Sequence, residues 1–167
     1  MLETGQDYRG VNPTQENIEA GLTTLTEKTM GPLSKIGRSG FAGCLGFADR
    51  PAAPGLHFMD TPFFSPTSLT GMALGGAQVG LFAMGVFNPS GMPLMPTLKV
   101  CGNPATLDRW ADSIDVDVAA LLTGAEDLDA GADRIHRAVR AVVAGEPTRA
   151  EHWTEGQLIA PRVTAAL

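Results

Sequence analysis

The sequence predicts a three-layer α/β fold, in which a mostly parallel sheet is covered by helices on both faces. Short apolar segments alternate with helical patterns along the chain, which is typical of parallel strands joined by helices. The segment 79–84 is continuously apolar, as expected for a strand buried on both faces. The layering is therefore Rossmann-like. The glycines at 37, 40, 43 and 46 lack the G-x-G-x-x-G order, so no nucleotide-binding loop is predicted.

A strand-loop-helix-strand unit is the clearest local prediction. A strand over 56–59 should end before Pro62, because proline cannot donate to a strand ladder. Ser65 is expected to cap a helix over 66–76, whose first position is a proline. The next strand covers 79–84. If the two strands are parallel, the loops after them lie at the same sheet edge, where ligands of open α/β sheets usually bind.

The other elements follow from apolar periodicity and capping patterns. They are a helix with a Thr24–Glu27 capping box, an apolar pattern from Leu22 to Ile36 and a break or bend at Gly31-Pro32, a strand over 41–47, a strand over 97–101, a short helix from Pro104, and a helix over 126–144 that begins with a Thr123–Glu126 capping box.

Composition predicts one domain over residues 1–167, with 1–10 and 150–167 peripheral. The net charge of -6 and the scattered lysines and arginines argue against a nucleic-acid partner. No segment has the pattern of a membrane span or a secretion signal. Two widely spaced cysteines fit neither a disulfide framework nor a zinc motif, so the expected location is the cytoplasm.

Several motifs, in order, resemble those of one enzyme family. They are Asn12-Pro13-Thr14 and Glu27-Lys28 near the start, MDTP at 59–62, GGAQ at 75–78 and LKVCGNPATLDRW at 98–110. Together they resemble the C-terminal domain of the altronate/galactarate dehydratase (altronate hydrolase) family. The chain departs from that family at 83–87, where the family commonly carries a TTGRG loop with an arginine.

The resemblance implies a hydro-lyase that dehydrates a small hydroxy acid, of the altronate or galactarate type, to a 2-keto-3-deoxy acid. It also implies a divalent metal, iron(II) or manganese(II), for the complete enzyme. His57, His136 and His152 are far apart in the sequence, so the metal ligands are expected outside this chain. The expected partners are a missing N-terminal catalytic part or subunit and further copies in a homo-oligomer. The alternatives are a non-catalytic structural or dimerisation lobe and part of a sulfolactate-type lyase.

Glu27 and Lys28 are the candidate catalytic residues, because both lie in the matched motif. Glu27 is a candidate base, and Lys28 is a candidate partner for a substrate carboxylate. The alternative is structural: Glu27 caps its helix and Lys28 points to solvent.

The candidate substrate-binding residues lie in the two loops that follow the strands of the central unit. Asp60 and Thr61 follow the first strand, and Asn88 and Ser90 follow the second. The alternative is that all four residues only shape turns.

Overall fold

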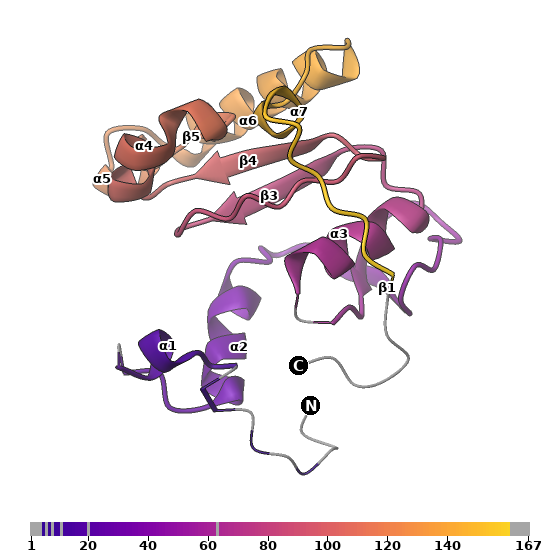
Figure 1. The fold of residues 1–167 in the computed structure, drawn as a ribbon, viewed down its shortest axis with the longest axis vertical. Helices are drawn as coiled ribbons and strands as arrows, with labels where there is room; N and C mark the ends of the chain where they lie inside the picture. The colour runs from indigo at the N-terminus through magenta and orange to yellow at the C-terminus, as the bar shows by residue number, and fades with distance from the viewer. Residues whose placement is uncertain are drawn as a thin grey trace.

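The computed structural model describes residues 5–160, apart from residues 6, 8, 11, 20 and 63 (Figure 1). Residues 1–4 and 161–167, which are parts of the regions 1–10 and 150–167 predicted to be peripheral, lie outside the described residues. The helices are α1 (Gln15–Glu19), α2 (Leu25–Ser34), α3 (Ser65–Leu74), α4 (Pro104–Trp110), the 3-10 helix η2 (Ala111–Ser113), α5 (Ala119–Thr123), α6 (Leu128–Val143) and α7 (Arg149–His152), and the strands are β1 (Phe41–Leu45), β2 (Leu56–Met59), β3 (Gly80–Met84), β4 (Thr97–Cys101) and β5 (Val116–Asp117).

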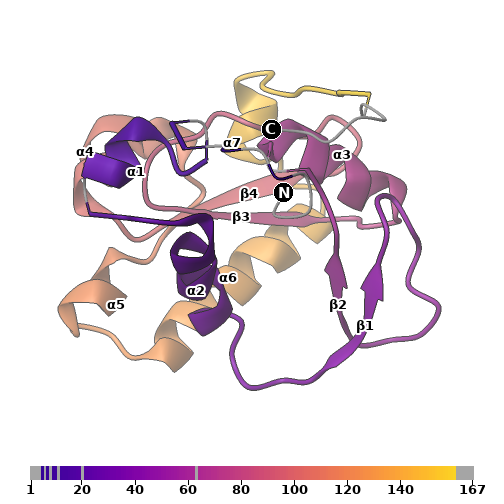
Figure 2. The same cartoon turned by 90° about the horizontal axis from the view of Figure 1, so that it is seen from below.

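All strand pairs in the described part of the chain are parallel, which confirms the predicted α/β class. In Figure 1, α6 and α7 lie on one side of β3 and β4, whereas α3 lies on the other. The strands form two sheets, β1–β2 and β3–β4–β5, whose strands run in different directions in Figure 2. The two strands of the central unit therefore belong to different sheets, and α3 connects one sheet to the other.

Strand β4 is the buried centre of the larger sheet. All five of its residues are buried, and it pairs with β3 on one edge and β5 on the other. The apolar cluster of Leu69, Met92 and Met95 links α3 to the segment before β4. The sheet is thus covered by α3 through this cluster, while α6 and α7 contact β4.

Two glycines let α3 approach the segment after β1 closely. A Cβ atom on Gly71 would lie 2.7 Å from the Phe47 ring, and one on Gly75 would lie 2.8 Å from the backbone oxygen of Asp49. Such distances leave no room for a methyl group. This is the close helix approach that glycines four residues apart on one helix face make possible.

The start of α2 was predicted correctly, and the predicted break at Gly31-Pro32 does not occur. The Thr24 side chain accepts a hydrogen bond from the Glu27 N–H at 3.1 Å, as the capping pattern predicts. The helix is not broken at Gly31-Pro32 and ends at Ser34. Pro32 lies in the last turn, which closes by a bond of 3.0 Å from the Lys35 N–H to the Pro32 carbonyl.

Two predicted caps were wrong. Phe64 is the N-cap of α3, because Ser65 lies inside the helix and its hydroxyl accepts from Asn88 instead. Helix α6 is capped by Asp127, whose carboxylate accepts from the Ala130 N–H at 2.8 Å. Glu126 is engaged in an ion pair with Arg134, and Thr123 is the last residue of α5.

Among the described residues, no helix combines the length and the apolar character needed to cross a bilayer.

Replacing Gly91 with alanine is expected to lower the free energy of unfolding by about 1–3 kcal/mol, because overpacking a buried site forces the backbone to shift. The added methyl group would lie 2.5 Å from the carbonyl oxygen of Glu155 and 3.1 Å from the Ala150 Cβ. Gly85→Ala is the matched control, since its Cβ would meet nothing within 4 Å. Urea unfolding of both variants is the measurement, and equal midpoints would contradict the expectation.

Candidate functional site

Lys28 extends from α2 to two asparagines near the start of the described chain. Its Nζ donates to the Asn12 Oδ1 at 2.8 Å and to the Asn17 Oδ1 at 3.0 Å. Asn12 is buried and precedes Pro13 through a cis peptide bond. Lys28, Asn12 and Asn17 are called the lysine cluster below. The structural alternative predicted that Lys28 points to solvent. Its ammonium group instead bonds to Asn12 and Asn17.

Local contacts hold the asparagines of this cluster in place. Asn17 lies in α1, where its backbone N–H donates to the Thr14 hydroxyl at 3.4 Å and its Oδ1 accepts from the Thr14 N–H at 3.4 Å. The Oδ1 atom is therefore oriented before it meets the ammonium group. Burial lowers the pKa of Lys28 from its ordinary value, because desolvation disfavours the charged form.

Glu27 is held by the residue before its helix cap. Its Oε2 atom accepts from the Thr23 hydroxyl at 2.6 Å and from the Thr23 N–H at 2.8 Å. The hydroxyl bond, with help from the backbone bond, lowers the pKa of Glu27. A carboxylate with a lowered pKa is a weaker base, so these contacts favour the capping interpretation over the role of a general base.

A second group of polar residues joins the loops that follow β2 and β3. The Asn88 Nδ2 donates to the Ser65 hydroxyl at 3.4 Å, and the Asn88 Oδ1 accepts from the Ser90 N–H at 2.9 Å. The Thr61 and Ser68 hydroxyls are 2.8 Å apart. The two loops therefore meet, but the prediction that their strands share the edge of one sheet was wrong, because β2 and β3 lie in different sheets. These five residues are called the loop cluster below.

A hollow of about 290 Å³ opens beside the loop cluster. Its lining combines hydroxyl groups with apolar side chains: Thr61, Pro62, Phe64, Ser65, Ser68, Leu69, Met72, Leu81 and Phe82. Asp60 is exposed at the end of β2, where its N–H donates to the Leu45 carbonyl at 2.9 Å. Its hydrogen bond fixes the direction in which the chain leaves β2.

The sequence-predicted site residues thus fall into two groups by their contacts. Glu27 and Lys28 are consecutive on α2, and Lys28 bonds to asparagines of the N-terminal segment. Thr61, Asn88 and Ser90 belong to the loop cluster. Neither Asn12, which lies in a matched motif, nor Asn17 was selected as a site residue. Their contacts with Lys28 were not predicted, because Asn12 and Asn17 are 16 and 11 residues away from it in the sequence.

A buried ion pair between β4 and the segment after α7 was also missed. The Lys99 Nζ lies 2.5 Å from the Glu155 Oε2, and the Lys99 side chain is fully buried. The same ammonium lies 5.7 Å from the centre of the Phe87 ring, which stacks on Trp110. The signal in the sequence was a single lysine inside an otherwise apolar strand.

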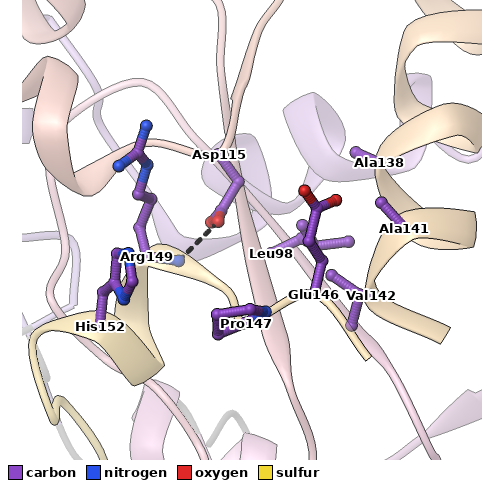
Figure 3. A pocket seen from close by; sticks show the side chains of 9 residues that line it. All are labelled: Leu98, Asp115, Ala138, Ala141, Val142, Glu146, Pro147, Arg149 and His152. Atoms are coloured by element: carbon purple, nitrogen blue, oxygen red, sulfur yellow. Dashed lines mark hydrogen bonds between the residues drawn. The ribbon is translucent and has the colours of Figure 1, made fainter. Parts of the chain in front are cut away.

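A second hollow, of about 360 Å³, lies between α6 and α7 (Figure 3). Arg149 and His152 lie on one side of Asp115 in this view, and Glu146 lies on the other. The Asp115 carboxylate accepts from the backbone N–H groups of Lys99 and Arg149, both at 2.7 Å. Asp115 therefore ties β4 to α7 and has a structural role.

The described residues do not fit a metal site by themselves. No group of three His, Cys, Asp or Glu side chains gathers among them. The His57 Nε2 pairs with the Ala53 carbonyl at 2.9 Å, while His136 and His152 lie on α6 and α7.

Known proteins resemble the chain over nearly its full length. A family model described as D-galactarate/altronate dehydratase, C-terminal, matches residues 1–165. The (2R)-sulfolactate sulfo-lyase subunit beta of Chromohalobacter salexigens is 35% identical over 94% of this chain and 41% of its own length. The galactarate dehydratase (L-threo-forming) of Escherichia coli is 27% identical over 91% of this chain and 29% of its own length.

The altronate dehydratase of Escherichia coli is 30% identical over 68% of this chain and 23% of its own length. The chain therefore spans less than half the length of each of these curated relatives.

Proposed function

Because the chain belongs to the D-galactarate/altronate dehydratase C-terminal family, we propose that it is the domain of a lyase that holds a small hydroxy acid during elimination. In the dehydration, a base removes the proton beside the carboxylate and the hydroxyl of the next carbon leaves as water. The resulting enol becomes a 2-keto-3-deoxy acid. Negative charge grows on the carboxylate as the proton leaves, so a cation placed there lowers the barrier.

The observation that carries the proposal is the ammonium of Lys28, oriented by two asparagine oxygens at 2.8 and 3.0 Å. Both asparagine oxygens are neutral hydrogen-bond acceptors, and their two bonds position the ammonium group. A lysine held in this way attracts a carboxylate more strongly than a mobile surface lysine, because its partial burial weakens the screening by water. Lys28 is the proposed anchor of the substrate carboxylate.

The other candidate residues take supporting roles in this proposal. Glu27 is a positioning residue that holds the start of α2 through Thr23. Thr61, Asn88 and Ser90 offer hydroxyl and amide groups for substrate hydroxyls at the edge where the two loops meet. Asp60 lies at the same edge as a further acceptor for a hydroxyl group.

The complete site is proposed to need more than this chain. The family relatives are more than twice as long as the segment they share with it. Metal ligands, if the enzyme uses iron(II) or manganese(II), and the residues that complete the cleft are proposed to lie in that further part. A homo-oligomer in the cytoplasm is part of the same proposal.

A sulfolactate-type lyase is the second candidate. The sulfo-lyase subunit is 35% identical over 94% of this chain. In addition, 83–87 lacks the arginine expected of a sugar-acid dehydratase. Sulfolactate is shorter than the sugar acids and carries a sulfonate in place of their hydroxylated carbons, so it would need fewer hydroxyl contacts from the loop cluster.

Keto-acid formation tests the proposed function. The purified chain is assayed under reducing conditions with iron(II) or manganese(II) against galactarate, glucarate, altronate and sulfolactate. The same assay is applied to a chimera in which this chain replaces the matching segment of the Chromohalobacter sulfo-lyase subunit. Turnover in either form supports the lyase assignment, and the preferred acid separates the two candidates. A folded, assembled chimera without turnover on any of these acids would favour the non-catalytic lobe.

A further inference from the structure

One face of the β1–β2 sheet is apolar and exposed. Phe41 and Phe58 form an edge-to-face aromatic pair with ring centres 6.4 Å apart, and they are 46% and 54% exposed. Cys44 pairs in register with Phe58, and Leu56 lies two residues before Phe58 on the same side of β2. Cys44 and Leu56 are exposed as well. Phe41, Cys44, Leu56 and Phe58 are called the aromatic face below.

The opposite face of the same sheet is covered by this chain. His57 and Met59 alternate with the exposed residues of β2 and are partly buried. The Met59 side chain approaches Gly75 at the end of α3, and the His57 ring bonds to the Ala53 carbonyl. One face of the sheet is therefore packed against its own domain, and the other has no such cover among the residues that the structure describes.

This arrangement is unusual for parallel strands. Parallel sheets occur almost only with both faces covered, and an isolated pair of strands is at best marginally stable in water. The aromatic face contains no Asp, Glu, Lys or Arg, so hydration does little to stabilise its exposed side chains. Burial of two exposed phenylalanines would stabilise the strand pair.

We propose that the aromatic face is the docking surface for the remaining part of the lyase polypeptide, which covers it with an apolar strand or helix. The inference rests on the proposed function, because it assumes that such a part exists. The relatives support this assumption. The match covers 41% of the sulfo-lyase subunit and 29% of the galactarate dehydratase, so 59% and 71% of these proteins lie outside it. Docking at this face also fixes β2, whose carboxyl end carries Asp60 and Thr61.

Cys44 reports directly on this docking. The rate at which N-ethylmaleimide labels Cys44 is measured by peptide mass spectrometry in the free chain and in the sulfo-lyase chimera. It is also measured in the free chain mixed with the part of the sulfo-lyase subunit that this chain does not match. Cys101 is buried and serves as an internal reference for unfolding. Labelling of Cys44 is expected to slow by about tenfold or more when the other part is present, because a covered thiol reacts only after local opening.

Phe58→Lys should abolish the protection, whereas Val143→Lys, a matched change of an exposed residue at the end of α6, should leave it intact. An unchanged rate in both the chimera and the mixture would overturn the proposal. The proposal would also be overturned if Cys44 became protected in the free chain at rising chain concentration and light scattering showed a dimer. The occupant of the aromatic face would then be a second copy of the chain. Protection without keto-acid formation would retain the docking surface and count against the proposed function alone.

Discussion

Replacing Lys28 with methionine is expected to lower kcat/KM for keto-acid formation by about 100-fold or more, the scale of losing one oriented charged donor in a site. The ammonium group meets a carboxylate whose negative charge increases as the proton leaves the neighbouring carbon. The variant should therefore lose part of its activity in kcat and part in KM. Steady-state kinetics with the preferred acid, in the form of the protein that turns over, gives both numbers.

Lys35→Met is the control for Lys28→Met, because Lys35 follows the same helix and is exposed. Lys28→Arg should recover little activity, since a planar guanidinium does not fit two asparagine oxygens that hold a compact ammonium group. Thermal unfolding of each variant separates a loss of activity from a loss of fold. A Lys28→Met protein that is folded and within about threefold of the parent kcat/KM would contradict the proposed anchor.

Replacing Glu155 with alanine is expected to lower the free energy of unfolding by about 3 kcal/mol or more, the usual cost of leaving a buried charge without its partner. The Lys99 side chain is fully buried, whereas that of Glu155 is 25% exposed. Removing the acid therefore leaves a cation in the core. Removing the lysine by Lys99→Met leaves an acid that reaches water, so this change should cost less, about 1 kcal/mol.

The double variant should recover most of the stability lost by Glu155→Ala, because no unpaired charge remains in the core. Urea unfolding of the parent, the two single variants and the double variant completes the cycle. The expected order of stability would be contradicted if Lys99→Met were as damaging as Glu155→Ala. Such a result would place the main energetic contribution in the packing of the lysine stem or in its contact with the Phe87 ring.

Elements with a strong local pattern were predicted well. The helix after Pro66, the strand before Met84 and the long helix that ends near Gly145 each carry their own apolar periodicity or proline signal. Their boundaries were less accurate where several residues near a helix start could cap it. Thr123 and Glu126 were predicted to form a capping box, but Asp127 caps α6, Glu126 pairs with Arg134, and Thr123 ends α5.

Contacts between distant segments could not be predicted from local patterns. Lys99 and Glu155 are 56 residues apart, so a lysine in an apolar strand gave no indication of its partner. The division into two sheets depends on how α3 packs on the core, and β5, with two residues, is too short to show a period. The motif around Lys28 was recognised, but its contacts with Asn12 and Asn17 required the fold of the N-terminal segment.

The most direct test of the central claim is whether the substrate protects Lys28 from chemical modification. The form of the protein that produces keto acid is treated briefly with acetic anhydride at rising concentrations of its acid, and acetylation of Lys28 and Lys35 is quantified by mass spectrometry. If a substrate carboxylate binds Lys28, acetylation of Lys28 should fall as the acid concentration rises, with a midpoint near the KM. Acetylation of Lys35 should not change. Equal acetylation of Lys28 with and without a saturating acid would contradict the claim.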